Sequence, residues 1–105
     1  MGLGHTLVKP NSQINLRVQS QVGFHPDLLV IPAEVFETCD VKAVRCVGEN
    51  VLDANGKVEV TQFSTSLSLI RSELQHNDWF VIEIENRTSS TKAFYGTVVG
   101  DLGER

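Results

Sequence analysis

The sequence contains few of the residues that usually mark a catalytic, metal-binding or disulfide-stabilised protein. Its 105 residues include two cysteines, three histidines, one tryptophan and one tyrosine. So few cysteines exclude a disulfide scaffold. The chain has neither a glycine-rich phosphate loop nor a G-x-S-x-G nucleophile pattern. The histidines fall in a polar N-terminal segment and in two expected turns, which is not a zinc-ligand spacing. We therefore expect no catalytic residue, no metal site and no cofactor, and we expect that the protein is not an enzyme.

The two cysteines, Cys39 and Cys46, predict buried free thiols. If the segment between them is extended, seven steps of ~3.3 Å place them far beyond the reach of a disulfide. They also lack a C-x-x-C or Cys/His partner pattern for a metal. Free cysteine usually behaves as a small apolar side chain, and reduced thiols favour a reducing compartment.

Basic residues and long apolar runs are also scarce. The nine Lys and Arg residues are scattered and the net charge is −4, so we expect no nucleic-acid partner. No apolar run reaches the length of a membrane span, and the start lacks the apolar stretch of a secretion signal. Gly2 and Thr6 fit a myristoylation pattern, which we discount because so short a pattern arises often by chance. We expect no membrane partner.

The clearest pattern is an alternation of apolar and polar residues over residues 79–100. In its first half Phe80, Ile82 and Ile84 share one face, and in its second half Phe94 and Val98 share one face. Alternation with a period of two is typical of strands that bury one side. A polar loop, residues 86–91, separates the two halves. We therefore expect a β-hairpin at the end of the chain.

Shorter alternating or apolar runs recur along the rest of the chain, between residues 14 and 71, with an Asp-Ala-Asn-Gly turn at residues 53–56 and one helical turn at residues 33–38. Regularly spaced short strands favour an all-β protein. We expect a single β-sandwich of seven or eight short strands, jelly-roll or immunoglobulin-like, over residues 14–105, preceded by an N-terminal arm, residues 1–13. The expected core comprises Leu16, Val30, Val44, Ile82, Ile84, Phe94 and Val98.

Two groups of residues are candidates for contacts with partners. The first group is the apolar part of the arm, Leu3, Leu7 and Val8, because three side chains bury too little surface to order thirteen residues within one subunit. The second group is Trp79 and Tyr95, which could form an exposed aromatic platform. Two acids on the outer face of the same strand pattern, Glu83 and Glu85, are interpreted as protection against edge-to-edge pairing.

Three segments together resemble a known group of proteins: residues 20–35 (SQVGFHPDLLVIPAEV), 41–52 (VKAVRCVGENVL) and 79–100. Their order resembles small uncharacterised β proteins of bacteriophages and bacteria, in which a turn-strand with F-x-P-x-x-L-V-I-P opens the fold and a hairpin ends it. The resemblance covers about two-thirds of the chain. The chain departs from the pattern of these proteins around Cys46 and residues 53–56. It implies a compact β-sandwich of virion shells and implies no catalytic residue.

These observations favour a structural, virion- or capsid-associated protein that packs as a multi-copy subunit. Its expected partners are further copies of itself or other virion proteins, and its expected location is the virion after synthesis in the host cytoplasm. The alternative is a carbohydrate- or peptide-binding β-sandwich module that uses Trp79 or Tyr95 as its platform. A metal-dependent enzyme of the cupin type is disfavoured, because His25 and His76 lie in expected turns rather than on barrel strands.

Overall fold

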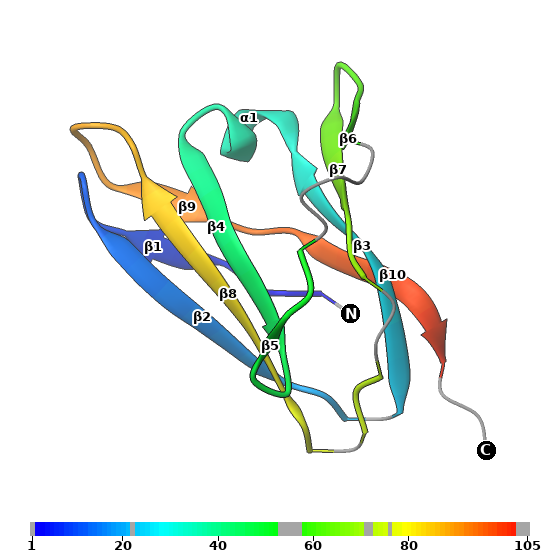
Figure 1. The fold of residues 1–105 in the computed structure, drawn as a ribbon. Coiled ribbons are helices and arrows are strands. Elements are labelled where there is room, and N and C mark those ends of the chain that lie inside the picture. Colours follow the sequence, from blue (N-terminus) through cyan, green and yellow to red (C-terminus); the bar gives the residue numbers. More distant parts are fainter. Residues whose placement is uncertain (1, 22, 53–57, 71–72, 76, 103–105) are drawn as a thin grey trace.

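The structure is a computed structural model that describes residues 2–21, 23–52, 58–70, 73–75 and 77–102. Their regular secondary structure consists of β-strands and one short helix (Figure 1). The elements in chain order are β1 (Thr6–Val8), β2 (Gln13–Gln19), β3 (Phe24–Pro32), α1 (Ala33–Phe36), β4 (Cys39–Cys46), β5 (Glu49–Asn50), β6 (Val58–Val60), β7 (Ser64–Ser68), β8 (Trp79–Asn86), β9 (Lys92–Phe94) and β10 (Thr97–Leu102). The expected all-β fold is confirmed.

Two four-stranded antiparallel sheets make up the two layers of the fold (Figure 1). One has the strand order β10-β3-β7-β6 and the other the order β2-β8-β4-β5. A small third sheet, β1-β9, lies beside them. The described strands outnumber the seven or eight that the sequence predicts, because interruptions at residues 47–48 and 95–96 split two of the expected runs and because β1 forms in the expected arm.

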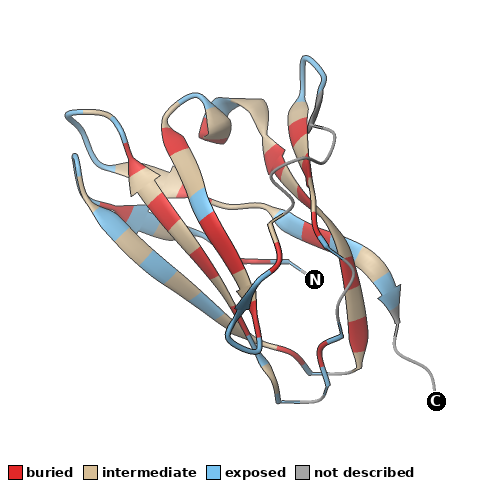
Figure 2. Cartoon of the chain, in the orientation of Figure 1, coloured by how far each residue is buried: buried red, intermediate tan, exposed pale blue. Residues whose placement is uncertain are grey.

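The core is a single cluster of buried residues, most of them from the two large sheets and the rest partly from β1, α1 and β9. Figure 2 marks the buried positions along the chain. Of the expected core residues, the five that are fully buried are Val44, Ile82, Ile84, Phe94 and Val98. Leu16 and Val30 are only half-buried, which differs from the prediction. In β3 the inward side chains are instead Leu29 and Ile31, both fully buried. A run of four apolar residues does not reveal which of its two faces points inward, since both faces look alike.

The predicted terminal hairpin is wrong. β8 pairs on one side with β2 and on the other with β4, so both of its edges are occupied. The second half of the pattern forms two strands, of which β9 pairs with β1 and β10 pairs with β3 in the opposite sheet. Alternation shows which face of a strand is buried, but it carries no information on which strand lies beside it.

The structure also corrects the predicted N-terminal arm. β1 forms a ladder with β9 in which Thr6 lies opposite Phe94. Leu3 is 6% exposed and Val8 is fully buried, so both belong to the core of the same chain. The estimate from three apolar side chains omitted the backbone hydrogen bonds of the β1–β9 ladder and the bond from Leu3 N to Gly96 O (3.1 Å). The sandwich therefore begins well before residue 14.

One predicted turn is instead part of a strand, and two glycines occupy positions that need their small size or their backbone freedom. The turn expected around His25 is instead the start of β3. Pro26 lies opposite Gly100, beside a bulge at which Asp27 of β3 is the extra residue and the ladder is interrupted. A Cβ atom on Gly100 would lie 1.9 Å from His25 O, so only glycine fits there. Gly48 has a φ of 86° and lies in the turn between β4 and β5. The Asp-Ala-Asn-Gly turn lies outside the described residues.

Two predictions near β4 are confirmed. α1 forms directly after Pro32, with a hydrogen bond from Glu37 N to Ala33 O (3.1 Å), as the helical turn predicted there requires. Cys39 and Cys46 occupy the two ends of β4 and are buried free thiols. The extended strand between them keeps them apart, which is the geometry that the sequence spacing indicates.

Candidate functional site

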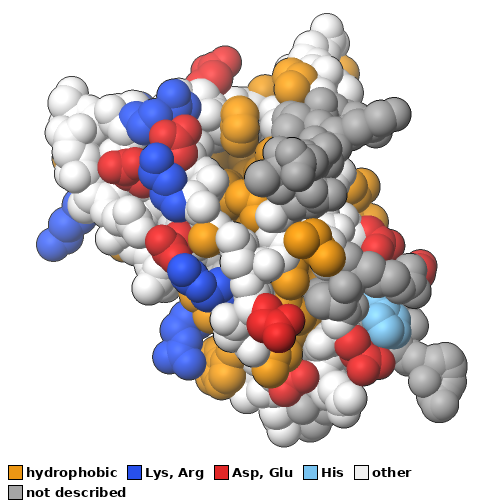
Figure 3. Space-filling view, viewed as in Figure 1, with side chains coloured by type: hydrophobic (Ala, Val, Ile, Leu, Met, Phe, Trp, Pro, Cys, Tyr) orange, Lys and Arg blue, Asp and Glu red, His pale blue; other side chains and the backbone are white. Residues whose placement is uncertain are grey.

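The outer face of the β2-β8-β4 sheet carries a ladder of ion pairs (Figure 3). Glu83 in β8 pairs with Arg45 in β4 and accepts a hydrogen bond of 2.8 Å from Gln13 Nε2 in β2. Two residues further along β8, Glu85 Oε1 lies 3.2 Å from Lys42 Nζ. Because β8 is a central strand, the interpretation of Glu83 and Glu85 as edge protection is wrong. The two acids instead balance the cations of a neighbouring strand.

This ladder does not have the arrangement of an acid/base site. Both carboxylates lie beside a cation, and a third acid on this face, Asp40, has its Oδ1 atom 3.1 Å from Arg87 Nε. The participating side chains of Lys42, Asp40 and Arg87 are all more than a third exposed. Exposed pairs of this kind contribute little to stability, so the ladder acts mainly as a polar covering of the sheet.

Trp79 lies at the start of β8, on the same outer face. This residue is 42% exposed, and the guanidinium carbon of Arg17 lies 4.5 Å from the centroid of its ring. A cation stacked on an indole ring occupies the surface that a sugar or base would need. The structure therefore covers one face of the expected platform with a side chain of β2.

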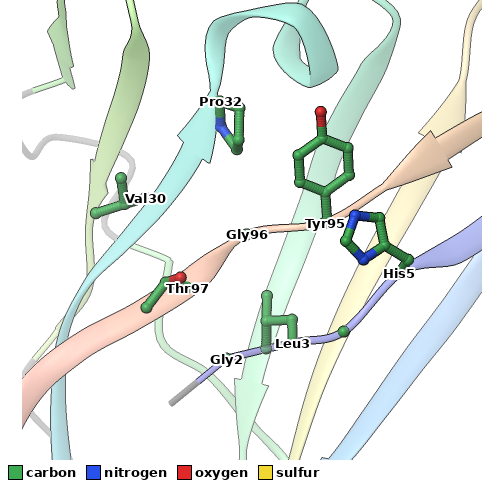
Figure 4. A pocket seen from close by; sticks show the side chains of 9 residues that line it. Gly2, Leu3, His5, Val30, Pro32, Tyr95, Gly96 and Thr97 are labelled. Carbon is green, nitrogen blue, oxygen red and sulfur yellow. The ribbon is translucent and has the colours of Figure 1, made fainter.

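Tyr95 lines a hollow between the N-terminal segment, β3 and β10 (Figure 4). The hollow has a volume of about 240 Å³ and is lined mainly by glycine and apolar residues, among them Leu3, Val30, Pro32 and Gly96. The imidazole of His5 stacks on the Tyr95 ring, with the centroids 4.5 Å apart and the planes inclined by 29°. One ring face of Tyr95 is therefore covered by its own chain.

The hydroxyl group of Tyr95 donates a hydrogen bond to Glu34 Oε1 in α1. That hydrogen bond, together with desolvation and the negative charge of Glu34, raises the pKa of Tyr95 above its ordinary value of 10.0. The bond also fixes the ring beside the hollow, because it links residues 61 positions apart in the sequence. Tyr95 is thus a held side chain that borders an open hollow.

A second surface feature is the end of the hairpin formed by β6 and β7, which extends beyond the body of the sandwich (Figure 1). Here Val60 is 70% exposed and Phe63 is 75% exposed. The turn between them is well ordered by hydrogen bonds, since Thr61 Oγ1 accepts from Phe63 N (3.1 Å) and from Ser64 N (3.0 Å). We call Val60 and Phe63 the apolar tip.

The apolar tip borders a second hollow, of about 260 Å³. Its lining includes Phe63 from the hairpin and Pro32, Ala33 and Glu34 from the end of β3 and α1. Pro32 lines both hollows, so they are neighbours at this end of the sandwich. The hydrogen bond from Ala33 N to Phe63 O (2.9 Å) joins the hairpin to α1 and holds the apolar tip in place.

The five residues that the sequence predicts for partner contacts are not brought together. Leu3 and Val8 are buried within the chain, Leu7 is 73% exposed, and Trp79 and Tyr95 belong to different surfaces. The sequence pattern did not indicate the apolar tip. Its only signal is a pair of large apolar residues on either side of Thr61 and Gln62, in a run that otherwise reads as an ordinary alternating strand.

Among the described residues, no group of three or more His, Cys, Asp or Glu side chains has the geometry to hold a metal ion. His25 has its Nε2 atom 3.7 Å from Glu73 Oε2, and His5 stacks on Tyr95. In the same described ranges there is no helix with the length and apolar character needed to cross a membrane.

The chain matches no protein-family model, no curated protein sequence and no solved structure.

Proposed function

We propose that this protein is a structural subunit that packs in many copies in a larger assembly, of the virion- or capsid-associated type. The observation that carries the proposal is the apolar tip. Val60 and Phe63 lie within four residues of one another, both largely exposed, on a hairpin that projects from the sandwich. Apolar side chains gathered on a projecting element mark a surface for contact with another protein.

The way in which the apolar tip is built supports this proposal. The Thr61 hydroxyl group and the bond from Ala33 N to Phe63 O fix the turn, so the backbone that carries the exposed aromatic side chain is ordered before contact. Holding it before contact reduces the entropy that association must overcome. Aromatic anchors of this kind carry much of the binding energy in protein interfaces.

The charge of the surface fits the same proposal. The outer face of the β2-β8-β4 sheet combines acids with cations, as in the pairs of Glu83 with Arg45 and Glu85 with Lys42. A surface of mixed sign allows copies to approach one another without the repulsion of a single-signed field. The virion setting itself comes from the resemblance of residues 20–35, 41–52 and 79–100 to virion β proteins.

The molar mass of the purified protein in solution tests this proposal. We expect light scattering to give a mass of several subunits that falls on dilution. The double variant Val60→Asp with Phe63→Asp should lower that mass, because it places charge on the apolar tip. The matched control is Gln21→Asp with Ser89→Asp, which adds the same charge at exposed polar positions and should leave the mass unchanged. A monomer at all concentrations contradicts the proposal.

A second candidate function, a carbohydrate- or peptide-binding module, is favoured by the hollow beside Tyr95. Its volume of about 240 Å³ suits a single sugar ring or one peptide side chain, being near the lower end of ligand pockets, which begin at ~300 Å³. Saturable binding of a monosaccharide or short peptide to a stable monomer, abolished by Tyr95→Ala and unaffected by Trp79→Ala, would establish this function in place of the structural one.

A further inference from the structure

The two large sheets end in four outer strands, and three of these are protected against pairing with another chain. In the first sheet the outer strands are β10 and β6, and in the second they are β2 and β5. The ladder that joins β10 to β3 shifts register between Val99 and Gly100, where Asp27 of β3 is an extra residue, while β5 and β6 have only two and three residues. Bulges and short length are devices that prevent edge-to-edge association. β2 has seven residues in continuous register with β8, no proline and one charged residue.

The inward face of β2 is incompletely covered. Ile14, Leu16 and Val18 pack against the core but are only partly buried, whereas the residues opposite them in β8 are fully buried. The turn of residues 9–12 connects β1 to β2, but β1 pairs with β9 and not with β2 (Figure 1). Among the described residues, β8 is the only strand that pairs with β2. A row of three apolar side chains therefore lies along an open strand edge.

The hydrogen bonds at the two ends of β2 show which backbone groups face that open edge. Asn86 N donates to Ser12 O (2.9 Å) at one end, and Ser20 N donates to Asp78 O (2.9 Å) at the other. In an antiparallel ladder, residues alternate between pointing their N–H and C=O toward the partner strand and away from it. Even-numbered residues of β2 therefore face β8. The backbone groups of Asn15 and Arg17 point outward.

We propose that β2 pairs antiparallel with β2 of a second copy of this chain, across a two-fold axis at Leu16. This inference rests on the proposed function as a self-associating subunit, and it names the surface through which two copies meet. It joins two four-stranded sheets into one continuous sheet of eight strands. Leu16 then faces its own counterpart in a non-hydrogen-bonded pair, where side chains approach most closely.

The sequence of β2 is self-complementary in this register, which is why a second copy is the occupant. Reversing the strand about Leu16 places Ile14 opposite Val18 and Asn15 opposite Arg17, so apolar residues meet apolar residues. The outward backbone groups of Asn15 and Arg17 become mutual hydrogen-bond partners. Arg17, the one charge on the strand, does not face Arg17 of the other copy. A symmetric interface of this kind is isologous and closes as a dimer.

A pair of charge variants at Asn15 tests the pairing and its register. Asn15 is exposed, so both variants should fold. Asn15→Glu places an acid opposite Arg17 of the other copy twice per dimer and should tighten dimerisation by about three- to thirty-fold, while Asn15→Lys should weaken it by a similar factor. Within one chain Asn15 lies opposite Glu83. Asn15→Glu therefore places two acids side by side and lowers the stability of the subunit relative to Asn15→Lys. Tighter association of the Glu variant therefore cannot come from a better-folded subunit.

Two further variants separate strand pairing from other contacts. Asn15→Pro removes an outward N–H without removing a bond to β8, and it should abolish the dimer, whereas Asn15→Thr keeps the N–H and should dimerise normally. Dissociation constants come from sedimentation equilibrium, with circular dichroism to show that each variant is folded. Self-association that is indifferent to the Glu and Lys variants overturns the β2 pairing and leaves the proposed function standing. A wild-type protein that stays monomeric overturns both.

Discussion

The buried side chain of Asn86 donates a hydrogen bond of 3.0 Å from its Nδ2 atom to the backbone carbonyl of Val8. The same amide donates to Ser90 O (2.8 Å), and its Oδ1 atom accepts from Thr88 N (2.9 Å) and Thr88 Oγ1 (2.8 Å). One side chain at the end of β8 thus organises the following loop and also fastens β1 to the sandwich.

We expect Asn86→Asp to destabilise the fold by about 2–4 kcal/mol, because a carboxylate would face two carbonyl oxygens with no protons to donate in a buried place. Urea denaturation measures the loss. The matched control is Asn50→Asp, since Asn50 is exposed and uses its acceptor oxygen, toward Leu52 N (3.2 Å). Equal effects of the two changes would show that the amide of Asn86 has no special role.

The N-terminal segment provides a matched pair of leucines. Leu3 is 6% exposed and Leu7 is 73% exposed, although both lie within a few residues of each other. Leu3→Ala should cost about 2–4 kcal/mol through lost burial and the cavity left behind, while Leu7→Ala should stay within about 0.5 kcal/mol of the wild type. Thermal and urea denaturation of the two variants measures these changes in the free energy of unfolding. If Leu3→Ala is as harmless as Leu7→Ala, the N-terminal residues are an arm outside the core after all.

Two phenylalanines allow a test of the register of the last strands. Phe94 is fully buried, whereas Phe63 at the apolar tip is 75% exposed. Phe94→Ala should reduce the free energy of unfolding by ~3–5 kcal/mol, and Phe63→Ala should change it by less than about 0.5 kcal/mol. Denaturant melts compare the two directly. A change of under about 1 kcal/mol for Phe94→Ala would place its ring on the surface and contradict the alternation found in β9 and β10.

The sequence correctly predicted several properties of single strands. The alternation in residues 79–86 correctly gave Phe80, Ile82 and Ile84 as the buried face of β8. The spacing of Cys39 and Cys46 correctly gave two separated buried thiols. Both properties follow from the geometry of one extended segment, which repeats every two residues.

The pairing between strands could not be predicted from the sequence pattern. β8 and β10 have similar patterns and are close in the sequence, yet they belong to different sheets. Which strand lies beside which depends on contacts between distant residues, such as Val98 with Leu29 or Thr6 with Phe94. Local periodicity contains no record of these contacts, because every apolar face in the chain is equally suited to the core.

At the candidate site, too, the sequence indicated a single residue but not the residues that contact it. Tyr95 stood out as an aromatic residue on the polar face of an alternating run, and the structure places it beside an open hollow. Its partners Glu34 and His5 come from α1 and from the N-terminal segment, which no spacing rule links to position 95. The apolar tip was missed because the exposure of Phe63 depends on how far the β6–β7 hairpin extends beyond the body of the sandwich, and that distance is a property of the whole fold.

The titration of Tyr95 tests the contact that links α1 to this hollow. The hydrogen bond to Glu34, supported by desolvation and by the negative charge, holds the pKa of Tyr95 above 10.0. A raised pKa means that folding favours the neutral hydroxyl group, so this contribution to stability is present below pH 10 and is lost as the pH rises through the folded-state pKa. Because Tyr95 is the single tyrosine of the chain, the absorbance of tyrosinate reports this group alone.

We expect the pKa of Tyr95 to fall in order from the wild type through Glu34→Gln to Glu34→Ala. Glutamine removes the negative charge but keeps an acceptor oxygen for the Tyr95 hydroxyl group, whereas alanine removes both the charge and the hydrogen bond. Glu37→Ala is the control, since it removes an acid that lies just beyond α1 and is exposed, and it should leave the titration unchanged. If the absorbance titration of Glu34→Ala coincides with that of the wild type, Glu34 does not hold Tyr95 in solution. The ring would then be free to turn away from the hollow, which would also remove the observation that favours ligand binding there.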